Sequence, residues 1–277
     1  MKDTRKRYIL PVIIGAVIVV FVAIGLLRKH DIEGDSSLVE NFKKPGGDTL
    51  AVGIEMSPLT YILENDTAEG FDYLMLRDMA RQHGVPVKFH PFTQLDRAFT
   101  DLKDKKYDLL VAAMPSTAAL KEYFPLTDAV YIDRQVLVQL ADSAGGKGAV
   151  GSQEQLMGDT LWIAKGKPFK TRLQNMAKEL GDTITVLTDP EQSSEHLAIM
   201  TALGQIKHAV VGEAVARRVA RQYPQLDIST PISLSQFQVW AIAPGDSALL
   251  DTLNRWIDEF KATAEYRRLA EHYLSNN

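Results

Sequence analysis

The feature that most constrains this chain is an uncharged stretch of 20 residues, Tyr8 to Leu27. A helix of that length spans roughly 30 Å, which is the thickness of the hydrocarbon core of a bilayer. The stretch ends in Leu26-Leu27-Arg28-Lys29, without the small-x-small pattern at which a signal peptide is cut. We therefore predict that residues 8–27 are a retained transmembrane anchor. A cleaved signal peptide is the alternative.

Basic residues precede this stretch and set its orientation. The cluster comprises Lys2, Arg5, Lys6 and Arg7, and it is larger than the pair that follows the stretch. Because cytoplasmic flanks carry the excess of Lys and Arg, residues 1–7 should stay in the cytoplasm. The part of the chain after the anchor should then lie on the opposite side of the membrane. Residues 28–48 are polar and contain Pro45-Gly46-Gly47, so we expect a linker there.

Charge and composition exclude several classes of function. Residues 1–30 carry a net charge of +5 and the remainder −9, and an acidic soluble part argues against a nucleic-acid partner. The chain has no cysteine, which excludes disulfides, thiol catalysis and zinc–thiolate sites. The six histidines show no metal-ligand spacing such as His-Glu-x-x-His. We predict neither a metal site nor a cofactor.

Strand and helix patterns alternate after the linker. Short apolar runs predict strands, and apolar residues at helical spacing predict the helices between them. Such a β-α-β-α-β order implies parallel strands joined by right-handed crossovers. The expected strands are residues 50–54, 87–89 and 108–113, and the expected helices are residues 71–83 and 95–102.

A second α/β stretch and two returning strands predict a bilobed α/β domain over residues 49–275. We assign residues 49–136 and 237–275 to lobe 1 and residues 141–230 to lobe 2, with the chain crossing near 136–140 and 231–237. A cleft between two such lobes holds small ligands and closes by a hinge motion. The further expected strands are residues 161–164, 184–187, 208–211 and 237–242, and the further helices are residues 169–180 and 196–203.

Three segments, Glu69–Leu74, Lys106–Tyr131 and Asp246–Leu274, carry a family resemblance. In this order and spacing they resemble the bacterial extracellular solute-binding proteins, family 3. The resemblance implies a periplasmic-binding-protein type 2 fold that captures a small polar solute, amino-acid-like or peptide-like, for transport or sensing. It also implies a single-pass inner-membrane protein with its domain in the periplasm and an ABC permease as a partner.

One branch of this family is the regulatory half of membrane-bound lytic murein transglycosylase F. The segments Trp240-Ala241-Ile242 and Asn254-Arg255-Trp256 resemble that branch. The alternative function is therefore a non-catalytic regulatory module of cell-wall (murein) metabolism with a cell-wall enzyme as its partner. The sequence contains no Glu-Ser pair typical of the catalytic half and no candidate catalytic triad, so we expect no enzyme.

Four residues are candidates for ligand contact. Ser116 and Thr117 follow a buried strand, where their hydroxyls either hold a ligand oxygen or cap a helix. The resemblance implies that Tyr61 stacks on the ligand, with packing on the lobe surface as the alternative. It also implies that Glu213 binds a ligand ammonium, and a carboxylate at the end of a parallel strand faces the cleft in such sheets.

The resemblance places an arginine that grips the ligand carboxylate at position 120, where this chain has Leu120. Leucine cannot donate a hydrogen bond, so the usual bidentate pair is lost at this position. Lys121 is the adjacent alternative cation. We therefore predict a neutral or cationic ligand, or no small ligand at all, and no binding of glutamate or aspartate.

Overall fold

A parallel sheet organises the first lobe of this computed structural model, which describes residues 49–64, 67–144, 149–164, 169–181, 184–189 and 192–274. Strand β1 pairs in parallel with both of its neighbours, as the sequence predicts, and a short antiparallel strand completes the edge. The strand order is β13-β5-β1-β4. The bounds are β1 (Leu50–Glu55), β4 (Val87–Phe92), β5 (Leu109–Val111) and β13 (Ala241–Ile242).

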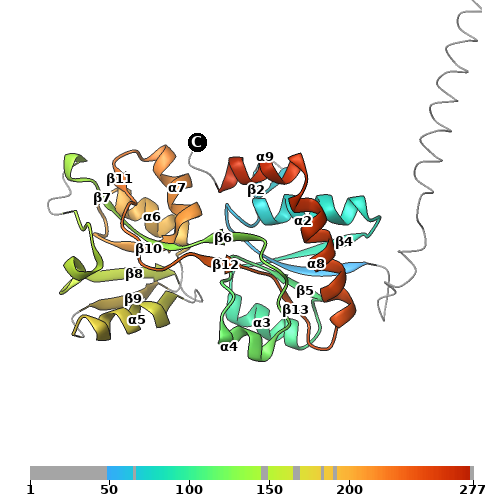
Figure 1. Cartoon of the computed structure of the whole chain (residues 1–277). Helices are drawn as coiled ribbons and strands as arrows, with labels where there is room; N and C mark the ends of the chain where they lie inside the picture. The colour runs from blue at the N-terminus through green and yellow to red at the C-terminus, as the bar shows by residue number, and fades with distance from the viewer. Residues whose placement is uncertain are drawn as a thin grey trace, which may run out of the picture. The chain divides into compact units, whose positions relative to one another are not determined.

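Helices cover both faces of this sheet (Figure 1). On one side lie α2 (Phe71–Gln82), α8 (Ser247–Lys261) and α9 (Ala264–Tyr273), and on the other α3 (Leu95–Lys103) and α4 (Ala118–Tyr123). We call this part lobe 1; it also carries a hairpin of β2 (Ile62–Glu64) and β3 (Thr67–Glu69). Apolar residues at helical spacing bury one face of α8, and they are Leu249, Leu253, Trp256, Ile257 and Phe260.

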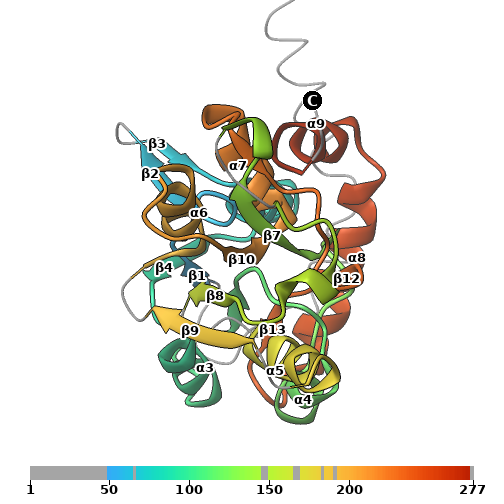
Figure 2. The same cartoon turned by 90° about the vertical axis from the view of Figure 1, so that its left-hand side faces the viewer.

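A five-stranded sheet forms the second part, which we call lobe 2 (Figure 2). The order is β11-β7-β10-β8-β9, with β8, β9 and β10 parallel and β7 antiparallel to β10. The strand bounds are β7 (Gln135–Leu140), β8 (Thr160–Ala164), β9 (Thr185–Asp189), β10 (Ala209–Gly212) and β11 (Leu226–Asp227). The helices are α5 (Phe169–Glu179), α6 (Ser194–Ala202) and α7 (Glu213–Gln222), with the short turns η1 (Asp142–Ala144) and η2 (Gln153–Leu156).

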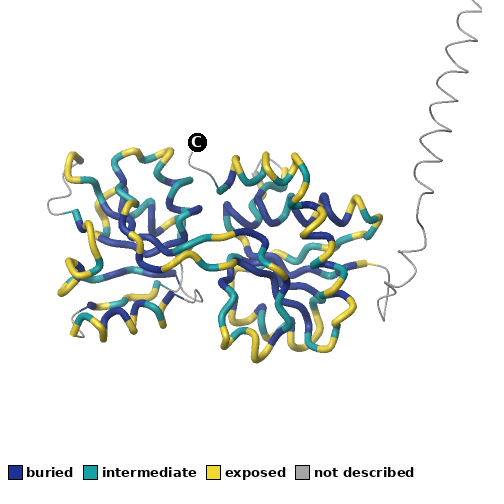
Figure 3. Tube along the Cα trace, in the orientation of Figure 1, coloured by how far each residue is buried: buried dark blue, intermediate teal, exposed yellow. Residues whose placement is uncertain are grey.

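Alternating side chains of the strands divide the core of lobe 2 between the two faces of its sheet. Leu137 packs with the apolar face of α5, including Leu173, whereas Val136 and Val138 pack with α6 and α7. This is the two-residue period of a strand buried on both sides. Figure 3 shows the result as buried strands enclosed by helices with exposed outer surfaces.

Two strands, β6 (Tyr131–Asp133) and β12 (Gln236–Gln238), pass between the two sheets as an antiparallel ribbon (Figure 1). We call this ribbon the hinge. Strand β7, which we expected near the first crossing, pairs inside the sheet of lobe 2. The predicted limits of the two lobes stay a prediction.

The single strand expected over residues 237–242 is divided into β12 and β13, with Val239 and Trp240 between them. The backbone N–H of Trp240 donates to Oγ1 of Thr127 at 3.0 Å, and its indole Nε1 donates to Oδ1 of the fully buried Asp72 at 2.9 Å. These bonds hold the chain where it leaves the hinge and enters the sheet of lobe 1. The prediction of one continuous strand was therefore wrong.

The predicted segments 1–7, 8–27 and 28–48 lie outside the described residues. Among the helices that the structure does describe, none has both the length and the apolar character needed to cross a membrane.

Candidate functional site

A cavity of about 380 Å³ is bounded by both lobes and the hinge. Lobe 1 contributes the end of β1, the loop after it and the start of α3; lobe 2 contributes the starts of α5 and α6 and part of α7. The hinge side is formed by Asp133, Arg134 and Gln135 together with Gln238. This volume is within the range of pockets that enclose small molecules. We call this cavity the cleft.

Two buried or half-buried carboxylates face the cleft. Glu55 ends β1 and is 8% exposed, and its Oε2 accepts a hydrogen bond from the backbone N–H of Ala113 at 3.3 Å. Asp133 ends β6, and its Oδ1 accepts from the N–H of Ala214 at the start of α7, also at 3.3 Å. In open α/β sheets, ligands bind outside the carboxyl ends of the strands. The cleft therefore presents negative charge where a ligand would enter.

The carboxylate of Asp133 is largely buried and closely packed against Gly212. Burial raises the pKa of Asp133 to about 6, although hydrogen bonds from the backbone of Arg134 and Ala214 oppose that rise. Gly212 makes room for this carboxylate, since a Cβ at position 212 would lie 2.6 Å from Oδ2 of Asp133. Close to neutral pH the carboxyl group is mainly ionised and able to pair with a cation.

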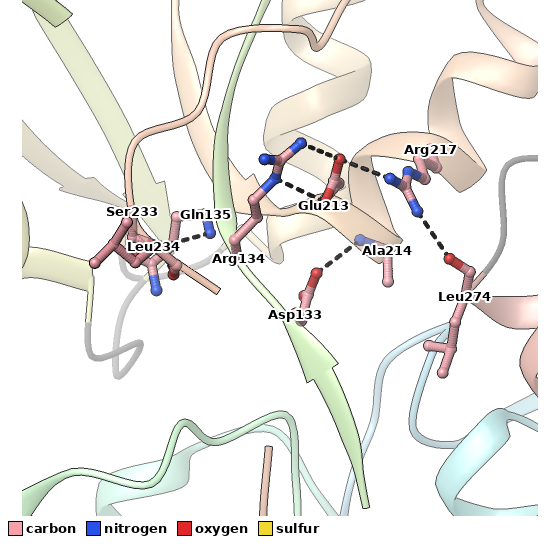
Figure 4. A network of polar contacts seen from close by, with 9 residues as sticks. All are labelled: Asp133, Arg134, Gln135, Glu213, Ala214, Arg217, Ser233, Leu234 and Leu274. Carbon is pink, nitrogen blue, oxygen red and sulfur yellow. Dashed lines mark hydrogen bonds and ion pairs between the residues drawn. The ribbon is translucent and has the colours of Figure 1, made fainter. Parts of the chain in front are cut away.

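A network of charged side chains joins the hinge to lobe 2 (Figure 4). Nε and Nη2 of Arg134 donate to Oε2 and Oε1 of Glu213, each at 2.9 Å. Arg217, one turn along α7, donates to the same Oε1 at 2.7 Å and from its Nη1 to the carbonyl oxygen of Leu274 at 2.9 Å. Glu213 is thus shared by two guanidinium groups, and the network reaches from the cleft to the end of α9.

Two residues that line the cleft each have a side-chain polar atom that is buried without a hydrogen-bond partner among the described residues. They are Oε1 of Gln135 and Oγ of Ser194. Gln135 is 5% exposed, and its Nε2 donates to Oε1 of Gln236 at 2.9 Å. Buried polar groups are nearly always hydrogen-bonded, so these two atoms are exceptions in the wall of the cleft.

None of the four residues proposed from sequence is among those that line the cleft in the described part of the chain. Tyr61 lies edge-on to Tyr73, with ring centroids 5.3 Å apart. The backbone N–H of Ser116 donates to the carbonyl of Phe237, whereas Oγ1 of Thr117 caps α4. Glu213 lies behind Arg134 and is bound to it. Their contact with a ligand stays a prediction.

The two residues compared with the family's arginine position also lie apart from the cleft lining. Leu120 is partly buried and packs against the apolar cluster of lobe 1 beneath α3 and α4. Lys121 is exposed on α4.

The residues that do line the cleft had weak signals in the sequence. Glu55 directly follows the apolar run of β1, and Asp133-Arg134-Gln135 is a polar interruption between two apolar strands. A polar residue at the end of a predicted strand is the pattern that could have indicated these residues. It is not specific, because most turns also place polar residues at strand ends. Among the described residues, no group of three or more metal-ligating side chains comes together.

The fold and the cleft together define a bilobed α/β protein of the periplasmic-binding-protein type. The model of the bacterial extracellular solute-binding proteins, family 3, matches residues 49–276, so this chain belongs to that family.

The chain is also similar to particular members named membrane-bound lytic murein transglycosylase F. It is 24% identical to the one from Desulfosudis oleivorans over 256 residues, which are 92% of this chain and 55% of that protein. It is 27% identical to the one from Aeromonas hydrophila over 243 residues, which are 87% of this chain and 47% of that protein. The chain spans about half the length of these relatives.

Solved structures share the fold. An ancestral arginine-binding protein bound to arginine superimposes with a TM-score of 0.71 at 23% identity, covering 83% of this chain and 99% of that one. The substrate-binding protein of an amino acid ABC transporter gives a TM-score of 0.67 at 20% identity, covering 82% and 99%. At these identities the likeness shows the periplasmic-binding-protein fold alone.

Proposed function

We propose that this chain captures a small polar solute, amino-acid-like or peptide-like, by closure of its two lobes, for transport or sensing. The observation that carries the proposal is the cleft of about 380 Å³, which both lobes and the hinge line with polar side chains. A ligand that contacts both lobes binds the closed form better than the open form and so shifts that equilibrium. We further propose that the chain is not itself an enzyme.

The charge of the cleft indicates the charge of the ligand. Glu55 and Asp133 present carboxylates, so the cleft favours groups that donate hydrogen bonds or carry positive charge. The arginine-bound protein of the same fold supports an amino-acid-like ligand. A second ligand carboxylate would be repelled, which keeps glutamate and aspartate outside the proposed ligand class.

Thermal unfolding of the full-length chain in detergent tests this function against a panel of amino acids, dipeptides and muropeptides. A solute that binds only the folded protein raises its melting temperature. At a concentration a hundredfold above Kd, the free energy of unfolding increases by about 2.7 kcal/mol. We expect neutral or basic amino acids or dipeptides to raise the melting temperature and glutamate and aspartate to leave it unchanged. No shift with any member of the panel would contradict solute capture.

The second candidate function is regulation of a cell-wall enzyme. The similarity to several proteins named lytic murein transglycosylase F, each about twice as long as the matched region, favours it. The same panel distinguishes the two functions. A shift with muropeptides, in the absence of any shift with free amino acids, would favour regulation.

We also propose that residues 8–27 anchor the chain in the inner membrane with residues 31–277 in the periplasm. The uncharged stretch and the basic residues before it support this orientation. An alkaline phosphatase fused after Asn277 should be active in a double-membrane bacterium. An inactive phosphatase paired with an active cytoplasmic reporter at the same position would reverse the orientation.

A further inference from the structure

We propose that Arg134 is the carboxylate-binding residue of the cleft, and that the ligand is a zwitterion or cation with one carboxylate and at least one ammonium group. This inference rests on the proposed function and names the ligand class of the same cleft. The family resemblance does not mark Arg134, because the position compared with the family's arginine is Leu120, and that side chain packs in the core of lobe 1.

The pairing of Arg134 with Glu213 leaves one edge of the guanidinium open. Glu213 takes the edge formed by Nε and Nη2. The remaining nitrogen, Nη1, has no hydrogen bond in the described part of the chain and points away from Glu213 (Figure 4). A guanidinium carries five N–H donors in a planar fork, so the edge formed by Nη1 and Nη2 can still hold a carboxylate through parallel hydrogen bonds.

The open edge is held in place before any ligand arrives. Glu213 fixes Arg134 through two bonds, and Arg217 fixes Glu213 through a third. The side chain of Glu213 is 15% exposed, and that of Arg134 is 36% exposed. Arg134 therefore lines the cleft while it is bound to a more deeply buried carboxylate. Rotamer freedom is already lost in such an arrangement, which lowers the entropic cost of binding.

The other arginine that lines the cleft in the described residues is Arg97. Its side chain is 78% exposed, and its closest ion pair, with Asp101, measures 3.9 Å. A mobile exposed cation contributes little to binding because water and salt screen it. Arg97 is therefore a matched control, with the same charge in the same cleft but without the fixed geometry.

Acceptors for the ligand's positive group lie in the same cleft. They are the carboxylates of Glu55 and Asp133. One guanidinium edge on one side and acidic acceptors on the other match a molecule with a single carboxylate and an ammonium. A ligand with two carboxylates would leave one of them without a cation and near an acid.

The test compares each of two amino acids with its own amide, in which a neutral carboxamide replaces the carboxylate. L-arginine and L-argininamide, and L-leucine and L-leucinamide, are titrated calorimetrically into the full-length chain in detergent. We expect the wild-type protein to bind at least one acid about 10- to 100-fold more tightly than its amide, as the loss of a charged hydrogen-bonded pair implies. In Arg134→Met this preference should fall to about onefold. Arg134→Lys should retain part of it, and Arg97→Met should change it less than about threefold, the scale of an exposed ion pair.

Thermal unfolding of each variant shows that it is folded, and Arg134→Lys keeps the test valid if Arg134→Met is unstable. An unchanged preference for the acid in folded Arg134→Met or Arg134→Lys overturns the assignment and leaves solute capture intact. A wild-type protein that binds the amides as tightly as the acids overturns it in the same way. A protein that binds none of these solutes, nor any in the panel above, overturns solute capture and this assignment together.

Discussion

Gly70→Ala is expected to destabilise the folded domain by about 3–5 kcal/mol, the range reached by exceptional point mutants. Gly70 precedes α2 with φ 127° and ψ 145°, a region of backbone space open almost exclusively to glycine. A Cβ at this position would lie 2.5 Å from the carbonyl oxygen of Thr60 and 2.9 Å from the N of Tyr61. These are backbone atoms of lobe 1, so they cannot move aside as a flexible side chain would.

Gly84→Ala is the matched control for backbone strain. Gly84 also has a positive φ, of 66°, but a Cβ there would meet no atom within 4 Å. Its cost should be about 1 kcal/mol, the penalty of a left-handed conformation alone. Urea unfolding of both variants, followed by circular dichroism, gives the two free energies of unfolding. Equal losses in the two variants would show that the close approach to Thr60 does not constrain the fold.

The fold of each lobe could be predicted from local sequence patterns, because those patterns reflect which residues are buried. The parallel pairing of β1 with β4 and β5 follows from three apolar runs separated by helical periods, and the stripe of α8 is visible in its sequence. The break between β12 and β13 could not be predicted from the sequence. It depends on the contact of Trp240 with Asp72, 168 residues away, and no local pattern reports a partner at that separation.

The candidate site was harder to predict from the sequence, because it too depends on contacts between residues that are far apart in the chain. The sequence placed Glu213 at the end of a strand, which is correct in position, since α7 begins there directly after β10. It could not show that Arg134 and Arg217 would both bind this carboxylate, because Arg134 is 79 residues away. Thr117 shows the converse case. The helix-capping alternative that the sequence left open is the contact that the structure contains.

Glu55→Gln is expected to weaken binding of L-arginine by about 30- to 100-fold, as the loss of one member of a buried charge pair implies. Glu55 is 8% exposed at the end of β1 and lines the cleft, so little water screens its attraction for a ligand cation. Glutamine has nearly the same shape, and its amide oxygen can still accept the hydrogen bond from the N–H of Ala113. The substitution therefore removes the charge while keeping this contact.

Asp96→Asn separates this effect from the general charge of the cleft. Asp96 also lines the cleft, but it is exposed at the start of α3, where solvent screens its charge. Its removal should change the affinity for L-arginine less than about threefold, the scale of a surface ion pair. Calorimetric titration of both variants and the wild-type protein, at the same pH and ionic strength, gives the three dissociation constants. An affinity of Glu55→Gln within threefold of the wild-type value would mean that the ligand's positive group binds elsewhere in the cleft, with Asp133 as the remaining half-buried carboxylate at the hinge.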